Sequence, residues 1–190
     1  MKGITIMFRL SSVLMIVCGL LYPLSVTGVA QTLLPDQAKG SLVYNDQQEV
    51  IGSKLIGQTF ASPQYFHGRI SSIGYDAAAS GSPNYAPSNP ELIRRTEAAV
   101  SQWKEDNPEV PVDRLPADLV TNSGSGLDPH ISPAAALAQV PRVSQQTGLD
   151  EAELKRLIDA NTDRPLWGIF GEPGVNVLLL NLAVNKQRES

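Results

Sequence analysis

The segment from Leu10 to Pro35 most constrains what this chain can fold into, because its 26 residues include no charged side chain. Leu, Val, Ile and Met dominate the segment, and about 20 apolar residues in a helix are enough to cross the hydrocarbon core of a bilayer. Residues 36–190 are more polar and numerous enough to form one domain with its own core. The sequence therefore predicts a membrane-associated chain with a single folded domain.

A cleaved signal peptide is the alternative interpretation of this N-terminal segment. Lys2 and Arg9 form a basic start, an apolar stretch follows, and Gly28-Val29-Ala30 offers a small-residue cleavage site. The apolar character continues to Leu34, however, which is the length of a membrane span rather than of a leader. Under both interpretations the positive charges precede the apolar segment. The positive-inside rule then keeps the N-terminus cytoplasmic and places the domain outside.

Charge and cysteine content exclude several classes of function for the domain. Residues 36–190 carry 13 basic and 19 acidic side chains, whereas nucleic-acid binding needs clustered Lys and Arg. The one cysteine, Cys18, lies in the apolar segment, so the domain can contain neither a disulfide nor a thiolate metal site. We expect a cytoplasmic N-terminus at residues 1–9, a transmembrane anchor at 10–34 and an extracytoplasmic domain at 35–190.

Local patterns predict a mixed α/β domain after one transmembrane helix. Short strands are expected at residues 41–44, 50–51 and 54–56. Helices are expected over Pro90 to Asp106, Ala134 to Thr147, and a segment that starts near Asp150. The branched apolar run Val175 to Val184 is interpreted as a buried strand. Helices and strands alternate without a regular βαβ rhythm, so the predicted fold class is α+β.

Several residues give the expected helices their ends and their buried faces. Ser88 or Asn89 can cap the first helix, and Gly148 suits the left-handed end of the second. In the second helix Leu137 and Val140 are expected to face inward. Sequence spacing further predicts a capping box at the start of the third helix, formed by Asp150 and Glu153.

No group of residues in the domain predicts catalysis. The polar segment Thr121 to His130 contains Ser, Asp and His, but Gly124 directly precedes Ser125, whereas a nucleophile elbow requires the pattern G-x-S-x-G. We interpret that segment as a turn that leads to a helix cap. The two histidines, His67 and His130, lack metal-binding spacing, and the chain has no Walker motif.

The segment Tyr65-Phe66-His67-Gly68-Arg69 places two aromatic rings beside a guanidinium in an irregular part of the chain. Aromatic residues and Arg are the types that anchor protein interfaces. Either this segment contacts a partner, or it folds back onto its own core with Arg69 hydrogen-bonded locally. The sequence leaves both possibilities open.

A series of short motifs follows one another along the whole chain. They are Tyr22-Pro23, Gly52 to Gln58, Tyr65 to Arg69, Pro87 to Pro90, Asp118 to Thr121, Ser123 to Asp128, Gln139 to Val143, Val175 to Leu178 and Asn181 to Ala183. In this order they resemble the C subunit (KdpC) family of the bacterial Kdp-type potassium-transporting ATPase. The chain departs from the family pattern in its loops, at Ile70, Pro83, Tyr85 and Gly174, which leaves the roles of those loops open.

The resemblance implies a retained single span in the bacterial inner membrane and an outer domain. It also implies assembly with a channel-like potassium-binding subunit, a P-type ATPase catalytic subunit and a small fourth subunit. The chain would be non-catalytic, and the family is described as an assembly factor or as a chaperone that raises the ATP affinity of the catalytic subunit. Gln139 is implicated by the family in that nucleotide role. Potassium would be the ion that the complex transports.

The predicted sidedness conflicts with a nucleotide role for Gln139, because ATP is cytoplasmic and only residues 1–9 are expected inside. We therefore favour a scaffold or lid at the outer potassium entrance, with a secreted hydrolase or binding protein as the alternative. The candidate partner-contact residues are Tyr65, Phe66, Arg69, Ser88, Asn89, Asp128 and Arg142.

Overall fold

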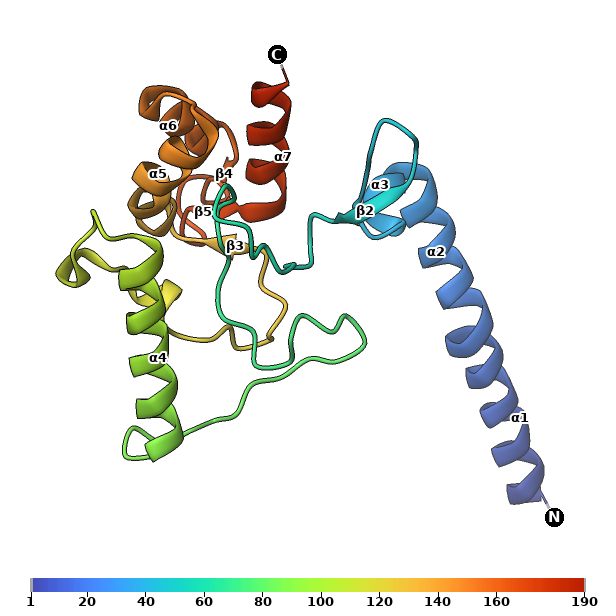
Figure 1. The fold of residues 1–190 in the computed structure, drawn as a ribbon. Helices are drawn as coiled ribbons and strands as arrows, with labels where there is room; N and C mark the ends of the chain where they lie inside the picture. Colours follow the sequence, from blue (N-terminus) through green and yellow to red (C-terminus); the bar gives the residue numbers. More distant parts are fainter. Residues whose placement is uncertain (1, 190) are drawn as a thin grey trace. The chain divides into compact units, whose positions relative to one another are not determined.

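The computed structural model describes residues 2–189, which form two units (Figure 1). One unit ends at Ser53 and the other begins at Lys54. The mixture of helices and strands confirms the predicted α+β class. The hairpin that follows the apolar helix belongs to the first unit.

The first unit consists mainly of one long apolar helix. It runs through α1 (Lys2–Ile16), the π-helical turn η1 (Val17–Leu21) and α2 (Tyr22–Leu33). The stretch Gly3–Leu33 contains an 18-residue window with a mean hydropathy of 2.2, and by length and composition it could cross a membrane. Its large apolar side chains are exposed in the isolated chain, which fits a helix that packs against lipid or other helices.

The π-helical turn explains how the helix continues through Pro23. Proline has no N–H, and its ring collides with the carbonyl four residues earlier in a regular helix. The amide of Tyr22 instead donates to the carbonyl of Val17, five residues earlier, so the turn before the proline is wider. The apolar segment is therefore one continuous helix through Tyr22-Pro23.

A short helix and a hairpin complete the first unit. They are α3 (Pro35–Ala38), β1 (Leu42–Tyr44) and β2 (Val50–Ser53), and the two strands pair antiparallel with an irregularity between Val43 and Tyr44. Two of the predicted strands are thus confirmed. The third, at 54–56, is not a strand, because β2 ends at Ser53.

The second unit contains four α-helices among its described residues, together with a small sheet. In chain order the elements are α4 (Pro90–Asp106), the 3-10 turns η2 (Val112–Arg114) and η3 (Ala117–Leu119), β3 (His130–Ile131), α5 (Pro133–Thr147), α6 (Glu151–Ala160), β4 (Thr162–Asp163), β5 (Gly174–Asn176) and α7 (Val177–Arg188). The sheet has the order β3-β5-β4 and is antiparallel, with Val175 paired to both Ile131 and Thr162. Helices α5 and α6 pack on each other, and α7 packs beside them (Figure 1).

Helix ends follow the sequence signals closely. Asn89, rather than Ser88, caps α4, and its Oδ1 accepts from the Glu91 amide at 2.8 Å. The Ser132 hydroxyl accepts from the Ala135 amide at 3.0 Å, and Gly148 ends α5 with φ = 75°. Asp150 stands at the cap position of α6, but its side chain makes no capping hydrogen bond, so the predicted capping box is wrong in its side-chain part.

The core lies between the sheet and the helices α5, α6 and α7. Its buried side chains come mainly from these elements: Phe66, Ile131, Ala135, Ala136, Val140, Val143, Leu154, Ile158, Val175, Val177, Leu180 and Val184. Val140 faces inward as predicted. Leu137 is not buried as predicted, because 45% of it is exposed.

The predicted strand Val175–Val184 is wrong for most of its length. Only Gly174–Asn176 is a strand, and the chain then turns into α7. The Asn176 side chain accepts from the Leu179 amide at 3.2 Å and so starts the helix. The buried positions Val177, Leu180 and Val184 recur every three or four residues, which is the period of a helix.

Candidate functional site

Two buried side-chain amides hold the segment Tyr65–Arg69, which we call the aromatic loop. Asn181 of α7 accepts from the amide of Phe66 at 2.8 Å and donates to its carbonyl at 2.9 Å. Gln139 of α5 does the same for His67, at 2.8 and 3.1 Å. Each side-chain amide thus replaces the neighbouring strand that a β-sheet would provide, and two consecutive residues of an irregular loop are fixed.

Arg142 secures the part of the chain that leads into the aromatic loop. Its Nη1 donates to the carbonyl of Tyr65 at 3.0 Å and also to that of Pro63, while Nε donates to Oδ1 of Asn107 at 3.0 Å. Its Nη2 donates to Oε1 of Gln139 at 2.7 Å. A single buried guanidinium therefore connects the loop with the end of α4 and with α5.

Burial changes the protonation equilibria of this network. It lowers the pKa of Arg142 to about 10, although the nearby carboxylate of Asp106 acts in the opposite direction, so the guanidinium remains charged at neutral pH. Burial, together with the charge on Arg142, lowers the pKa of His67 below its ordinary value. His67 is therefore neutral at neutral pH, and the network carries one positive charge that is solvated by carbonyl and amide oxygens.

The far end of the aromatic loop is fixed by an ion pair. Arg69 donates from Nη1 to Oδ2 of Asp128 at 3.0 Å, and both side chains are partly exposed. The hydroxyl of Tyr75 donates to the carbonyl of Arg69, and Oδ1 of Asp128 accepts from the amide of His130 at 3.0 Å. The Ser/Gly-rich turn that contains Asp128 therefore positions the loop instead of presenting a nucleophile.

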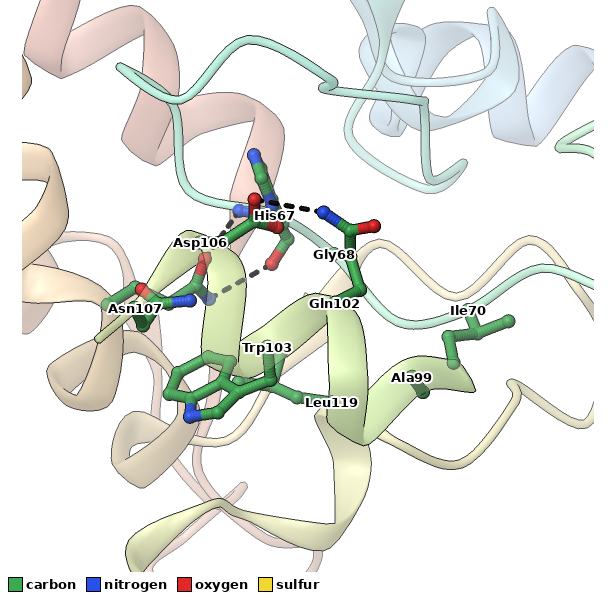
Figure 2. Close-up of a pocket in the computed structure, with 10 residues that line it drawn as sticks. His67, Gly68, Ile70, Ala99, Gln102, Trp103, Asp106, Asn107 and Leu119 are labelled. Carbon is green, nitrogen blue, oxygen red and sulfur yellow. Dashed lines mark hydrogen bonds between the residues drawn. The ribbon is translucent and has the colours of Figure 1, made fainter. Parts of the chain in front are cut away.

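A small cavity of about 210 Å³ lies beside the loop, between it and helices α4 and α5 (Figure 2). Its lining combines apolar and polar side chains: His67, Gly68, Ile70, Ala99, Gln102, Trp103, Asp106, Asn107, Leu119 and Gln139. In Figure 2 the amide of Gln102 points to the carboxylate of Asp106, with Nε2 and Oδ1 3.0 Å apart. The cavity has room for a group the size of an aromatic ring, but it is smaller than the sites of about 300–1,000 Å³ that bind drug-sized ligands, so it does not suit a nucleotide.

The hydrogen-bonding capacity of Gln139 is fully used within the domain. Its Oε1 accepts from the His67 amide and from Arg142, and its Nε2 donates to the carbonyls of His67 and Ala135. An amide side chain offers two donors and two acceptor lone pairs, so none is left over. A ligand could engage this amide only by breaking bonds that hold the loop.

The structure brings some of the candidate partner-contact residues together and separates others. Tyr65, Phe66, Arg69 and Arg142 share the loop and its supports, and Asp128 pairs with Arg69. Ser88 and Asn89 stand at the start of α4, away from this network. The side chain of Phe66, one of these candidates, is completely buried and offers no contact surface in this structure. Arg142 is also buried, at 6% exposure, so it too does not offer a contact surface.

Sequence reasoning missed two members of the network, Asn107 and Asn181. Asn181 interrupts an apolar run, and a polar residue at such a position signals a buried amide with a specific partner. Asn107 directly follows α4, and its place in the sequence, before Pro108, indicates only the end of a helix. The residues that the structure describes contain no group of three or more His, Cys, Asp or Glu side chains that could hold a metal ion.

Comparison with known proteins agrees with the resemblance noted from the motifs. The family model described as "KdpC: K+-transporting ATPase, c chain" matches residues 4–186. A protein of Bacillus cereus named potassium-transporting ATPase KdpC subunit is 58% identical over 178 residues, which covers 94% of this chain and 92% of that protein. A protein of the same name from Bacillus cytotoxicus is 58% identical over 179 residues, 94% and 93% of the two chains. This chain therefore belongs to the KdpC family of potassium-transporting ATPase c chains.

Proposed function

We propose that this chain is a non-catalytic subunit of a potassium-transporting ATPase and that its outer domain serves as a scaffold for the complex. Family membership supports its role as a subunit, because the relatives are named as subunits of such an ATPase. The long apolar helix Gly3–Leu33 supports attachment to the membrane. The alternative of a secreted hydrolase finds no support in the network of polar side chains around the aromatic loop, because those side chains hold the fold.

The saturated Gln139 amide is the single observation that carries the scaffold proposal. The family-implied contact between Gln139 and ATP would need a side-chain amide that is free to bind a ligand. The Gln139 amide instead bonds both the backbone N–H and the backbone carbonyl of His67. We infer that Gln139 acts by ordering the aromatic loop. ATP is then bound by the P-type catalytic subunit, and any effect of this chain on nucleotide affinity passes through the assembly.

The proposed topology has residues 1–9 in the cytoplasm, a span at 10–34 and the domain outside the inner membrane. The proposed partners are a channel-like potassium-binding subunit, the P-type catalytic subunit and a small fourth subunit. A lone helix cannot form an ion pathway, so the span packs against helices of these chains. The domain carries no nucleic-acid-binding character, since acidic side chains outnumber basic ones.

Removing the chain tests the scaffold proposal. Cells that lack it are expected to lose growth at low potassium, and the remaining subunits are expected not to co-purify in mild detergent. Growth and a complete complex without this chain would contradict the proposal. A photoreactive ATP analogue applied to the intact complex is expected to label the catalytic subunit only, and a label on the peptide that contains Gln139 would contradict our assignment of this residue.

Cysteine accessibility tests the sidedness. With Cys18→Ser as background, Glu105→Cys places a thiol on the exposed face of α4, and Gly3→Cys places one at the start of the apolar helix. A membrane-impermeant maleimide is expected to label Glu105→Cys in cells with an intact plasma membrane, and Gly3→Cys only after permeabilisation. The reverse pattern would place the domain in the cytoplasm.

A further inference from the structure

The connection between β4 and β5 exposes four large apolar side chains at one place. Leu166, Trp167, Ile169 and Phe170 are 62%, 81%, 77% and 62% exposed, respectively. No charged residue occurs between Arg164 and Glu172. We call Leu166–Phe170 the apolar hairpin. Single exposed apolar residues are ordinary, but a contiguous group of this kind on a soluble domain indicates a surface that another molecule covers.

Backbone hydrogen bonds give the apolar hairpin a defined shape. The amide of Leu166 donates to the carbonyl of Phe170 at 2.8 Å, and the amide of Phe170 donates back at 3.0 Å. The amide of Gly168 donates to the carbonyl of Pro165 at 2.9 Å. The rings of Trp167 and Phe170 pack edge to face with their centroids 6.2 Å apart. A surface ordered in advance binds with a smaller loss of conformational entropy.

Trp167 adopts a strained backbone conformation whose energetic cost is not offset by packing in the core of the domain. Its φ is 55°, in the left-handed region that costs a bulky residue about 1–2 kcal/mol. A buried ring could offset this cost by packing in the core, but the Trp167 side chain is largely in solvent. Among the described aromatic rings, the Trp167 ring packs only on that of Phe170, which is itself exposed, and strain at a residue outside the core is typical of a functional contact.

A groove of about 410 Å³ lies at the base of the apolar hairpin. It is formed by α5, α6, β4 and two residues that flank the hairpin in the chain, with the lining residues Pro133, Leu137, Lys155, Ile158, Asp159, Thr162, Arg164 and Pro173. Leu137, which is exposed on α5, contributes to its apolar part. Projecting apolar side chains next to a partly apolar groove suit a protein surface of complementary shape.

We propose that the apolar hairpin docks into an apolar groove on another subunit of the same ATPase, outside the bilayer. Because the family consists of subunits of an ATPase complex, another subunit of that complex is the expected partner. Because the hairpin carries no charge, the surface of the partner that binds it is expected to be apolar. Among the described residues, the carbonyls of Trp167, Gly168 and Ile169 accept no hydrogen bond. A protein groove can offer donors to these carbonyls, whereas the hydrocarbon of a bilayer cannot. A protein partner is therefore favoured over lipid insertion.

Photocrosslinking tests this contact, which rests on the proposed subunit function. The crosslinking amino acid p-benzoylphenylalanine replaces Trp167 in one sample and Ile93, an exposed residue of α4, in a control. In the purified complex, the probe at position 167 is expected to form a covalent adduct with another subunit, and the probe at 93 is not. An adduct with lipid only, or none, would overturn the docking proposal.

A double variant measures the contribution of the contact. Trp167→Asn with Phe170→Ser is expected to lower the yield of co-purified subunits by about ten-fold or more, as loss of interface anchors does, while Ile93→Ser leaves the yield unchanged. An unchanged yield from the double variant would overturn the docking proposal. The proposed function fails separately, if the wild-type chain itself purifies without other subunits.

Discussion

The aromatic loop Tyr65–Arg69 and the apolar hairpin Leu166–Phe170 both place aromatic rings in irregular parts of the domain, yet their surroundings are opposite. Phe66 is completely buried, whereas Trp167 is 81% exposed. The difference comes from the supports: Asn181, Gln139 and Arg142 provide the loop with hydrogen-bond partners inside the domain. Among the described residues, the backbone of the hairpin bonds only within the hairpin and to the adjacent Pro165. Aromatic content alone therefore does not identify an interface, and the partners of the backbone decide which segment is available to another chain.

The largest effect is expected from the guanidinium that supports the loop. Arg142→Met removes its donors and leaves the carbonyl of Tyr65 and the side chain of Asn107 without their partner. We expect a loss of about 3–5 kcal/mol in the free energy of unfolding, measured by urea titration of the full chain in detergent. Arg156→Met, at an exposed ion pair with Glu153, serves as the control and is expected to change little. Equal effects would contradict the importance of the buried network.

Gln139→Ala is expected to be the next most disruptive change. It leaves the amide and carbonyl of His67 unpaired inside the domain, which costs about 2–3 kcal/mol in the free energy of unfolding. Gln102→Ala removes an exposed amide that bonds only to Asp106 and is the matched control. Unchanged stability together with weaker ATP binding by the complex would support the nucleotide role that the family implies for Gln139. It would contradict our proposal that Gln139 orders the aromatic loop.

A change in the apolar hairpin should separate assembly from folding. Trp167→Asn replaces a bulky residue by one that tolerates a positive φ, so the domain is expected to keep its stability or gain up to about 1 kcal/mol. Thermal unfolding of the full chain measures this. A clear loss of stability would show that Trp167 holds the fold, which would remove the contrast between the two segments.

The smallest effect concerns pH. Because burial lowers the pKa of His67, the unfolded chain takes up a proton at a higher pH than the folded chain does. Stability is therefore expected to fall as the pH drops from about 6.5, the ordinary histidine value, toward the lowered pKa, and then to level off. His67→Gln should reduce the dependence of stability on pH. The comparison variant is His130→Gln, which changes the partly exposed histidine that pairs with Asp163. Unfolding titrations at several pH values measure both, and an equal reduction in the two variants would contradict the assignment to His67.

Local signals in the sequence predicted the fold where neighbouring residues decide it. The caps at Asn89 and Ser132, the end at Gly148 and the long apolar segment are all short-range patterns. The run Val175–Val184 was misjudged, since a short branched apolar run suits a buried strand and a buried helix equally well. The cap at Asn176 decides between them.

Burial of the aromatic loop could not be predicted, because its supports are distant in the chain. Gln139 lies 72 residues from His67, and Asn181 lies 115 residues from Phe66. No local pattern shows that these amides meet the loop. Conversely, the motif that contains Gln139 suggested a ligand contact, and only the geometry shows that all four of its hydrogen bonds are internal.

Hydrogen exchange followed by mass spectrometry compares the two segments directly. It is measured on the full chain alone in detergent and on the assembled complex, with and without ATP. We expect peptides covering Tyr65–Arg69 to exchange slowly in every state, and peptides covering Leu166–Phe170 to exchange rapidly in the chain alone and slowly in the complex. Rapid exchange of the aromatic loop that slows on assembly or on addition of ATP would contradict its structural role and restore it as the contact surface.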